Sequence, residues 1–205
     1  MNIIKAFNLN PRVLLLVLSF SLVVGCSSSS KKSEVLEPQA SSAAKAKPVL
    51  SEEEKARYQE GLAAISEKTY AQAEAIFLAL SARHVNLAGA YVNLGLIQQA
   101  QDNLPTAIKY YQQALAINPN NVTALVQMAL VHQSKGEFRD SEGLLKQALA
   151  QAPNNAVVNY NLGILYELYL RDYEQAIEHY QRYVNNVDSE DTKTVERWIK
   201  MLERK

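Results

Sequence analysis

Residues 88–121 read AGAYVNLGLIQQAQDNLPTAIKYYQQALAINPNN, and residues 122–155 read VTALVQMALVHQSKGEFRDSEGLLKQALAQAPNN. The two stretches have the same length, and both end in Pro-Asn-Asn. Their small and helix-breaking positions coincide, as in the pairs Gly95 and Ala129, Ala107 and Ser141, and Pro119 and Pro153. A fixed internal period of this length predicts a stack of similar structural units in place of one irregular globular core.

Equivalent positions of the repeat, which we call columns, continue on both sides of the two stretches. Gly61 and Gly163 extend the first column, Ala73 extends the second, and two further columns run through Tyr70, Leu104 and Phe138 and through Phe77, Tyr111 and Leu145. In the last unit the second half arrives one residue late, at Tyr173, Ala176 and Tyr180. We therefore expect a one-residue insertion in the turn at residues 170–172. The first unit is degenerate, because Leu80 replaces a small residue and Val85 replaces the proline.

The pattern resembles the tetratricopeptide repeat, whose unit is a helix–turn–helix of the same period. The resemblance implies an all-α solenoid of about four units, at residues 54–87, 88–121, 122–155 and 156–190, within a repeat domain at 51–191. Ser51 and Glu54 have the spacing of a capping box that begins the first helix. Residues 192–205 predict a capping helix that covers the last apolar surface, with Val195, Trp198, Ile199 and Leu202 on one face.

The N-terminal residues predict a secretory signal. Val13 to Val24 is a run without charge that follows Lys5 and Arg12, and it is shorter than the roughly 20 residues that a membrane-spanning helix needs. The run ends in Val-Val-Gly-Cys, which resembles the cleavage site of bacterial lipoproteins. That resemblance implies a signal peptide at residues 1–25 and a mature N-terminus at Cys26 that carries covalent lipid. An ordinary signal peptide that happens to contain a cysteine is the alternative.

The residues after Cys26 predict a location and a tether. Ser27 follows the cysteine, and in such lipoproteins this implies the outer membrane, here with the protein on its periplasmic face. Residues 26–50 comprise the lipidated cysteine and a flexible tether, because the stretch is polar, rich in Ser and Ala and without a helical or strand period. A short recognition segment at Val35-Leu36 is the alternative.

Composition excludes several classes of protein. Basic and acidic residues balance at 21 each, and removal of the signal leaves a net charge of −2, which argues against a nucleic-acid-binding face. The single Cys excludes an intrachain disulfide and a multi-cysteine metal cluster. His84, His132 and His179 lie outside any familiar ligand spacing, so each is expected to have a structural or surface role. We expect no enzyme, no metal site and no cofactor apart from the lipid on Cys26.

In the family that the repeats resemble, the first helices of the units line a groove that holds an extended peptide or a helix. The residues of this chain that match the groove are Tyr58, Leu62, Val92, Asn93, Leu96, Val126, Gln127, Leu130, Tyr160, Asn161 and Ile164. Leu96 and Leu130 stand where chaperone-binding members have the asparagine of a carboxylate clamp, so we expect no such clamp. A mostly apolar groove with an amide stripe suits an apolar or amphipathic segment of a protein partner. The alternative is that these side chains pack against one another or against the tether.

These expectations combine into an outer-membrane lipoprotein that serves as a scaffold or adaptor for a protein partner of an envelope machine. Its resemblance to the pilotin-type lipoproteins of type IV pili favours a role in pilus or secretin biogenesis. Alternatives of the same class are accessory proteins of TonB-type energy-transducing complexes, assembly factors of outer-membrane barrels and adaptors of peptidoglycan hydrolases. A carrier of a hydrophobic small molecule is the alternative of another class.

Overall fold

A computed structural model of the chain describes residues 48–187 and 192–205. The first helices of the four units are α1 (Glu52–Ser66), α3 (Ala88–Ala100), α5 (Val122–Ser134) and α7 (Ala156–Ile164), and α7 continues into the π-helical segment η2 (Leu165–Leu170). The second helices are α2 (Tyr70–Arg83), α4 (Leu104–Ile117), α6 (Phe138–Gln151) and α8 (Tyr173–Asn185), and α9 (Thr192–Leu202) follows them. The described residues form helices and turns and no strand, so the all-α prediction is confirmed. The predicted signal peptide, Cys26 and the tether up to residue 47 lie outside the described residues.

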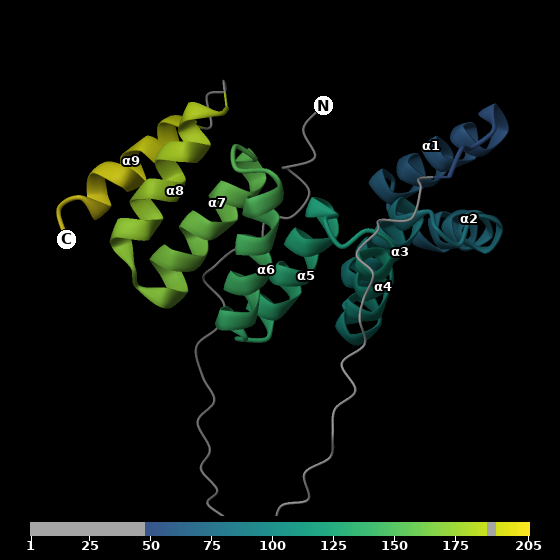
Figure 1. The fold of residues 1–205 in the computed structure, drawn as a ribbon, viewed down its shortest axis with the longest axis horizontal. Helices are drawn as coiled ribbons and strands as arrows, with labels where there is room; N and C mark the ends of the chain where they lie inside the picture. The colour runs from purple at the N-terminus through teal and green to yellow at the C-terminus, as the bar shows by residue number, and fades with distance from the viewer. Residues whose placement is uncertain (1–47, 188–191) are drawn as a thin grey trace, which may run out of the picture. The chain divides into compact units, whose positions relative to one another are not determined.

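Each helix packs against its neighbours in sequence, so the units form a stack (Figure 1). Two large clusters of buried apolar side chains form most of the core, one on α1 to α3 and one on α5 to α9. Two smaller clusters lie between them, made of Val92, Ala114 and Ala124 and of Ala107, Tyr111 and Val131. Because these clusters span consecutive units, each unit buries its apolar faces against its neighbours. Among the described residues, no helix combines the length and the apolar character that crossing a bilayer requires.

In three units, the first helix carries a glycine against which an aromatic ring of the second helix lies. The pairs are Gly61 with Phe77, Gly95 with Tyr111, and Gly163 with Tyr180. A Cβ atom on any of these glycines would overlap the ring, so a side chain does not fit there. Unit three has Ala129 and Leu145 in the same columns, and both are fully buried. The shorter leucine leaves room for the methyl group of the alanine, so the two columns vary together.

The tyrosines of this column also form a hydrogen bond within their unit. Tyr111 Oη donates to Gln99 Oε1 at 2.7 Å, and Tyr180 Oη donates to Glu167 Oε2 at 2.7 Å. Unit three has a leucine in the tyrosine column, and Gln133, in the column of Gln99, has a buried Nε2 with no hydrogen-bond partner among the described residues. The tyrosine hydrogen bond of units two and four therefore has no counterpart in unit three.

The insertion of unit four lies in its first helix, and the prediction that placed it in the turn was wrong. The turn keeps its length in every unit, since each turn has one residue of positive φ at the same place: Lys68, Asp102, Gly136 and Arg171. In unit three, Glu137 N donates to His132 O, five residues earlier, whereas in unit four Asp172 N donates to Tyr166 O, six residues earlier. The extra residue is therefore absorbed between Tyr166 and Arg171, where the helix widens to π geometry.

The first unit presents a polar outer face. Leu94 and Ile97 of α3 pack in one cluster with residues of α2 and are fully buried. The same columns of α1 hold Glu60 and Ala63, and both are exposed. A terminal unit of a solenoid needs a polar outer face for solubility. The exposed Glu60 and Ala63 fit such a capping unit.

The helix α9 covers the other end of the described stack. Val195, Ile199 and Leu202 are buried in the cluster that includes residues of α8, which confirms the predicted capping helix. The ring centroid of Trp198 lies 5.7 Å from that of Tyr180, so the tryptophan belongs to the core.

The steric role of the glycine column predicts the effect of single methyl groups. Gly95→Ala should destabilise the domain by about 1–3 kcal/mol, because the new methyl group would overlap the buried ring of Tyr111. The double variant Gly95→Ala/Tyr111→Leu recreates the pair that unit three has, and it should recover part of the loss. Urea unfolding followed by circular dichroism measures both effects.

The matched control is Gly143→Ala, because a Cβ at this position of α6 meets nothing within 4 Å. This substitution should be neutral or stabilise the helix by up to about 1 kcal/mol. A Gly95→Ala variant as stable as Gly143→Ala would contradict the steric role of the column.

Candidate partner-binding surface

The predicted groove residues fall into a buried set and an accessible set. Val92, Asn93 and Val126 are buried. Leu62 is 36% exposed, and the remaining members are partly buried: Tyr58, Leu96, Gln127, Leu130, Tyr160, Asn161 and Ile164. The accessible set is open to a partner, whereas the buried set supports the surface from below.

Several groove positions serve packing within the stack. Asn93 Nδ2 donates to Tyr58 Oη at 2.9 Å, and this bond ties α3 to α1. Tyr58 also meets the ring of Phe77 edge-on, with centroids 5.3 Å apart, and burial raises the pKa of its phenol. Tyr160 packs on Tyr183, with centroids 5.0 Å apart. These positions fit the alternative that the sequence left open, namely mutual packing.

One residue from each first helix forms a row that we call the aliphatic stripe: Leu62, Leu96, Leu130 and Ile164. Each member stands one full repeat after the previous one, so the four occupy the same place on successive first helices. Leu96 packs against the cluster around Val92, and Leu130 against the cluster that contains Val126. The members stay at least partly accessible, and a row of accessible aliphatic side chains suits the apolar face of a partner.

Sequence reasoning missed one exposed apolar side chain of this region. Val157 on α7 is 41% exposed. It lies one turn before Asn161 and two turns before Ile164, and this spacing places the three on one helix face. The signal that could have found it is the i, i+4, i+7 spacing of the three residues. Asn161 Nδ2 donates to Val157 O at 2.8 Å, so part of the predicted amide stripe is engaged by its own helix.

A hollow of about 610 Å³ opens beside the start of α1. Its lining comes from the segment before α1, from α1, from the start of α3 and from the α4–α5 turn, and includes Leu50, Lys55, Tyr58, Leu87, Gly89 and Ile117. Of these residues, the sequence predicted Tyr58 alone as part of a groove. The others stand in turns and at helix ends, outside the columns on which that prediction rested.

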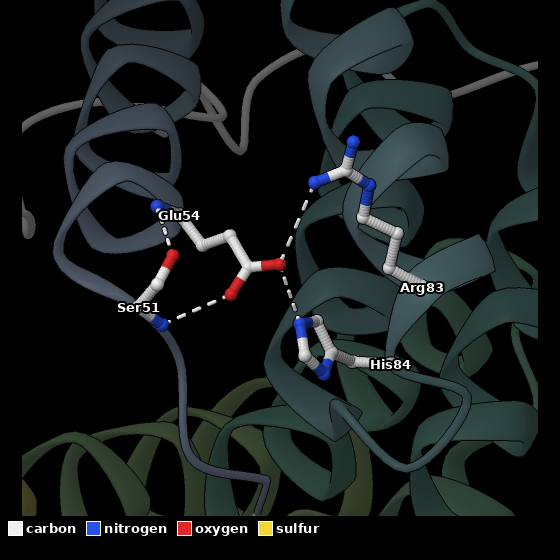
Figure 2. A network of polar contacts seen from close by, with 4 residues as sticks. All are labelled: Ser51, Glu54, Arg83 and His84. Atoms are coloured by element: carbon white, nitrogen blue, oxygen red, sulfur yellow. Dashed lines mark hydrogen bonds and ion pairs between the residues drawn. The ribbon is translucent and has the colours of Figure 1, made fainter.

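A polar network fixes the start of α1 beside this hollow (Figure 2). Ser51 N donates to Glu54 Oε2 at 2.9 Å, and Glu54 N donates to Ser51 Oγ at 3.2 Å, so the predicted capping box is present. Oε1 of Glu54 lies 2.8 Å from Nε2 of His84 and 3.8 Å from Nη1 of Arg83. The hydrogen bond from the Ser51 backbone, and then that with His84, lower the pKa of Glu54 to about 2.

A second carboxylate ties α6 to η2. Tyr166 Oη donates to Glu142 Oε1 at 2.8 Å, and Glu142 also pairs with Lys146 and Arg139 at 2.7 Å each. Burial by itself would raise the pKa of Glu142, but the hydrogen bonds from Lys146, Arg139 and Tyr166 outweigh it and lower the pKa to about 2. The carboxylate is therefore ionised and held between two helical segments, a structural arrangement.

The histidines also make contacts between elements. The buried His179 lies with Nδ1 3.1 Å from Asn159 Oδ1, and its ring stacks on that of Tyr166. Because Asn159 Nδ2 donates to two backbone carbonyls, its Oδ1 is the atom that accepts from His179, and burial lowers the pKa of this imidazole. His132 lies beside Glu137 and Asp140, and these three form the one group of at least three potential metal-ligating side chains among the described residues.

Acid should loosen the start of α1 through Glu54. The pKa of this carboxyl falls from an ordinary 4.5 to about 2 in the folded protein, so its contribution to stability is complete above about pH 4.5 and is lost as the pH falls toward 2. Backbone ¹³Cα shifts of α1 should therefore move toward coil values over this range in the wild type.

Glu54→Gln removes the titrating group, so its α1 shifts should already be reduced at neutral pH and change less on acidification. Glu52→Gln is the matched control, because Glu52 is an exposed residue of the same turn that pairs with Lys55 and stands outside the network of Glu54. Parallel acid transitions in the wild type and Glu54→Gln would contradict the role assigned to the network.

Known proteins resemble this chain in sequence and in fold. Models of the tetratricopeptide repeat match residues 88–121 and 121–188. No curated protein matches the sequence. A solved tetratricopeptide repeat protein from Parabacteroides merdae is 20% identical, with a TM-score of 0.60 over 75% of this chain, and the match spans 61% of the length of that protein.

Two solved structures of MamA have a similar fold. The MamA RS-1 ArsTM double mutant is 18% identical, with a TM-score of 0.56 over 76% of this chain and 97% of its own. A second MamA structure is 18% identical, with a TM-score of 0.52 over 62% of this chain and 73% of its own. At these identities the likeness shows the fold alone.

The matched residues cover units two to four, and the structure places two helices in each of these units. Their turns, glycine column and shared cores follow the same repeat period, with the single insertion in η2. The chain therefore contains tetratricopeptide repeats, and its described part is an all-α tetratricopeptide-repeat solenoid, a fold that typically serves as a non-catalytic scaffold for protein partners.

Proposed function

We propose that this chain is an outer-membrane-anchored periplasmic scaffold that binds a protein partner of an envelope assembly machine, with type IV pilus or secretin biogenesis favoured. The observation that carries the binding role is the aliphatic stripe. Leu62, Leu96, Leu130 and Ile164 repeat at the period of the units and keep part of their surface accessible. Accessible aliphatic groups in a row bury apolar area when a partner segment lies along them.

The chemistry of this surface favours an apolar or amphipathic segment as the partner. Gln127 and Asn161 lie three residues before Leu130 and Ile164, and their amide groups suit backbone atoms of such a segment, with Asn161 Nδ2 also donating to Val157 O. Neither a lysine nor an arginine belongs to the stripe, so recognition of a carboxylate is not part of the proposal. A nucleic-acid partner is also not proposed, because the net charge without residues 1–25 is −2.

The membrane anchor in this proposal is lipid on Cys26. Support comes from the apolar run of residues 13–24 and the Val-Val-Gly-Cys sequence that follows it. More than one acyl chain gives stable anchoring, whereas a single chain does not. Because the chain without residues 1–25 carries a net charge of −2, attraction to anionic lipid adds nothing, and the acyl chains provide the binding. No other cofactor is part of the proposal.

The binding role is tested with two leucines of similar exposure. Leu62→Asp on the stripe should weaken partner capture tenfold or more, because a partner would desolvate the new carboxylate. Leu78→Asp is the matched control, since Leu78 is 44% exposed but belongs to α2. A photocrosslinking amino acid at Gln127 reports capture in cells, and circular dichroism checks that both variants keep their helical content.

Leu96→Asp and Leu130→Asp extend the test, although these side chains also pack against the core and the folded state must be verified. Capture that survives Leu62→Asp and a folded Leu130→Asp would exclude the stripe. Equal loss in Leu78→Asp would point to a different surface.

The anchor is tested separately. Cys26→Ser should abolish labelling by a clickable fatty acid and remove the protein from the outer-membrane fraction, because the thiol is the proposed acyl acceptor. Ser27→Ala, a change at the next residue, should leave labelling intact. An unlabelled Cys26→Ser protein that still fractionates with the outer membrane would contradict anchoring by lipid.

A further inference from the structure

We propose that His132, Glu137 and Asp140 bind a divalent transition-metal ion, and that Zn²⁺ is the ion their chemistry fits best. His132 lies in the last turn of α5, Glu137 is the residue before α6, and Asp140 lies in the first turn of α6. One potential ligand atom from each side chain lies within 4.8 Å of the other two. The site is separate from the aliphatic stripe, and none of its residues belongs to the glycine or aromatic columns.

The backbone of the α5–α6 turn brings these ligands together. Gly136 has a φ of +78°, and Glu137 N donates to His132 O at 2.9 Å, so the turn fixes Glu137 beside the imidazole. Nδ1 of His132 lies 2.6 Å from Oε2 of Glu137. In a tetrahedral zinc site with bonds near 2.1 Å, ligand atoms stand about 3.4 Å apart. On binding, the contact between His132 and Glu137 widens from 2.6 Å toward this spacing, and the exposed Asp140 side chain moves toward them.

Unit two shows what the same three positions do without a metal. They hold Gln98, Asn103 and Thr106. Asn103 Nδ2 donates to Gln98 Oε1 at 2.8 Å, and Thr106 Oγ1 donates to Asn103 Oδ1 at 3.0 Å. Each acceptor of this neutral triad faces a donor. Side-chain hydrogen bonds thus link these three positions in unit two.

Unit three has other side chains at these three positions, and they cannot form the same two hydrogen bonds. The carboxylate groups of Glu137 and Asp140 offer acceptor oxygens, whereas Thr106 donates a hydrogen bond at the position of Asp140. A dication here binds all three side chains and competes with Lys135, whose ammonium group lies 2.6 Å from Glu137 Oε1. One imidazole nitrogen with two carboxylate oxygens is a donor set that zinc accepts, and it leaves a fourth position for water or for a partner side chain.

The orientation of the Glu137 side chain supports a metal site at this turn. It is the N-cap residue of α6, but its side chain makes no capping hydrogen bond. In unit four, Asp172 at the same place accepts a hydrogen bond from Gln175 N. The carboxylate of Glu137 instead reaches His132 with Oε2 and Lys135 with Oε1, the latter at 2.6 Å. Oε2 is thus directed toward the proposed site, and the ammonium group of Lys135 weakens the affinity for a cation there.

Isothermal titration of ZnCl₂ into the full chain tests the proposal. Every arm is untagged and carries Cys26→Ser, so that the thiol does not bind zinc. The Cys26→Ser chain should bind one Zn²⁺, and its Tm should rise with zinc concentration because zinc binds the folded state. Asp140→Asn should weaken binding about tenfold or more, whereas Lys135→Gln should strengthen it severalfold.

The triple variant His132→Gln/Glu137→Asn/Asp140→Thr installs the triad of unit two, which this fold already accommodates, and it should lose the site. His84→Gln is the matched control, because it removes a histidine–carboxylate pair for which the described residues supply no third ligand, and it should bind zinc as the Cys26→Ser chain does. Absence of one-site binding in the Cys26→Ser chain would overturn the proposal. So would equal affinity in Asp140→Asn or in the triple variant, or loss of binding in His84→Gln.

Discussion

The contact between a glycine backbone of the first helix and an aromatic ring of the second sets the geometry of units one, two and four. Without a Cβ the first helix leaves space for the whole ring, and in two units the ring places a hydroxyl group against a side chain one turn further along. Unit three reaches the same fold with Ala129 and Leu145, a pair in which the lost ring volume is offset by an added methyl group. The stack thus depends on the fit within each pair, and the identity of either residue is secondary.

The sequence was sufficient for the fold because every unit repeats the same contacts. Columns such as Gly61, Gly95, Ala129 and Gly163 report one steric requirement four times, so the period and the phase of the helices can be read directly. The place of the insertion could not be read in this way. A shift between Gly163 and Tyr173 shows that a residue has been added, but the hydrogen bonds decide where it goes. The turn keeps its left-handed residue and its closing bond to Tyr166, and the helix absorbs the change.

The candidate partner-binding surface could be predicted less well from the sequence than the fold. A repeat column shows which side of a helix a residue occupies, but it does not show how closely the next helix approaches. Val92 matches a groove position, yet it is buried in a cluster with Ala114 and Ala124. The group of His132, Glu137 and Asp140 escaped notice because its spacing fits no single helix face, and the three meet through the reversal of the chain at Gly136. The lipid anchor at Cys26 lies outside the described residues and stays a prediction.

The polar outer face of α1 bears on how copies of the chain can meet. A solenoid whose two ends were both apolar could join head to tail with further copies, and such a contact does not close on itself but grows into a filament. Here a copy stacked on the first unit would cover Glu60, which occupies the column that Leu94 and Leu162 fill inside the stack. Burial of a carboxylate without a cationic partner is strongly unfavourable. Glu60 therefore adds a desolvation cost to a head-to-tail contact on this face.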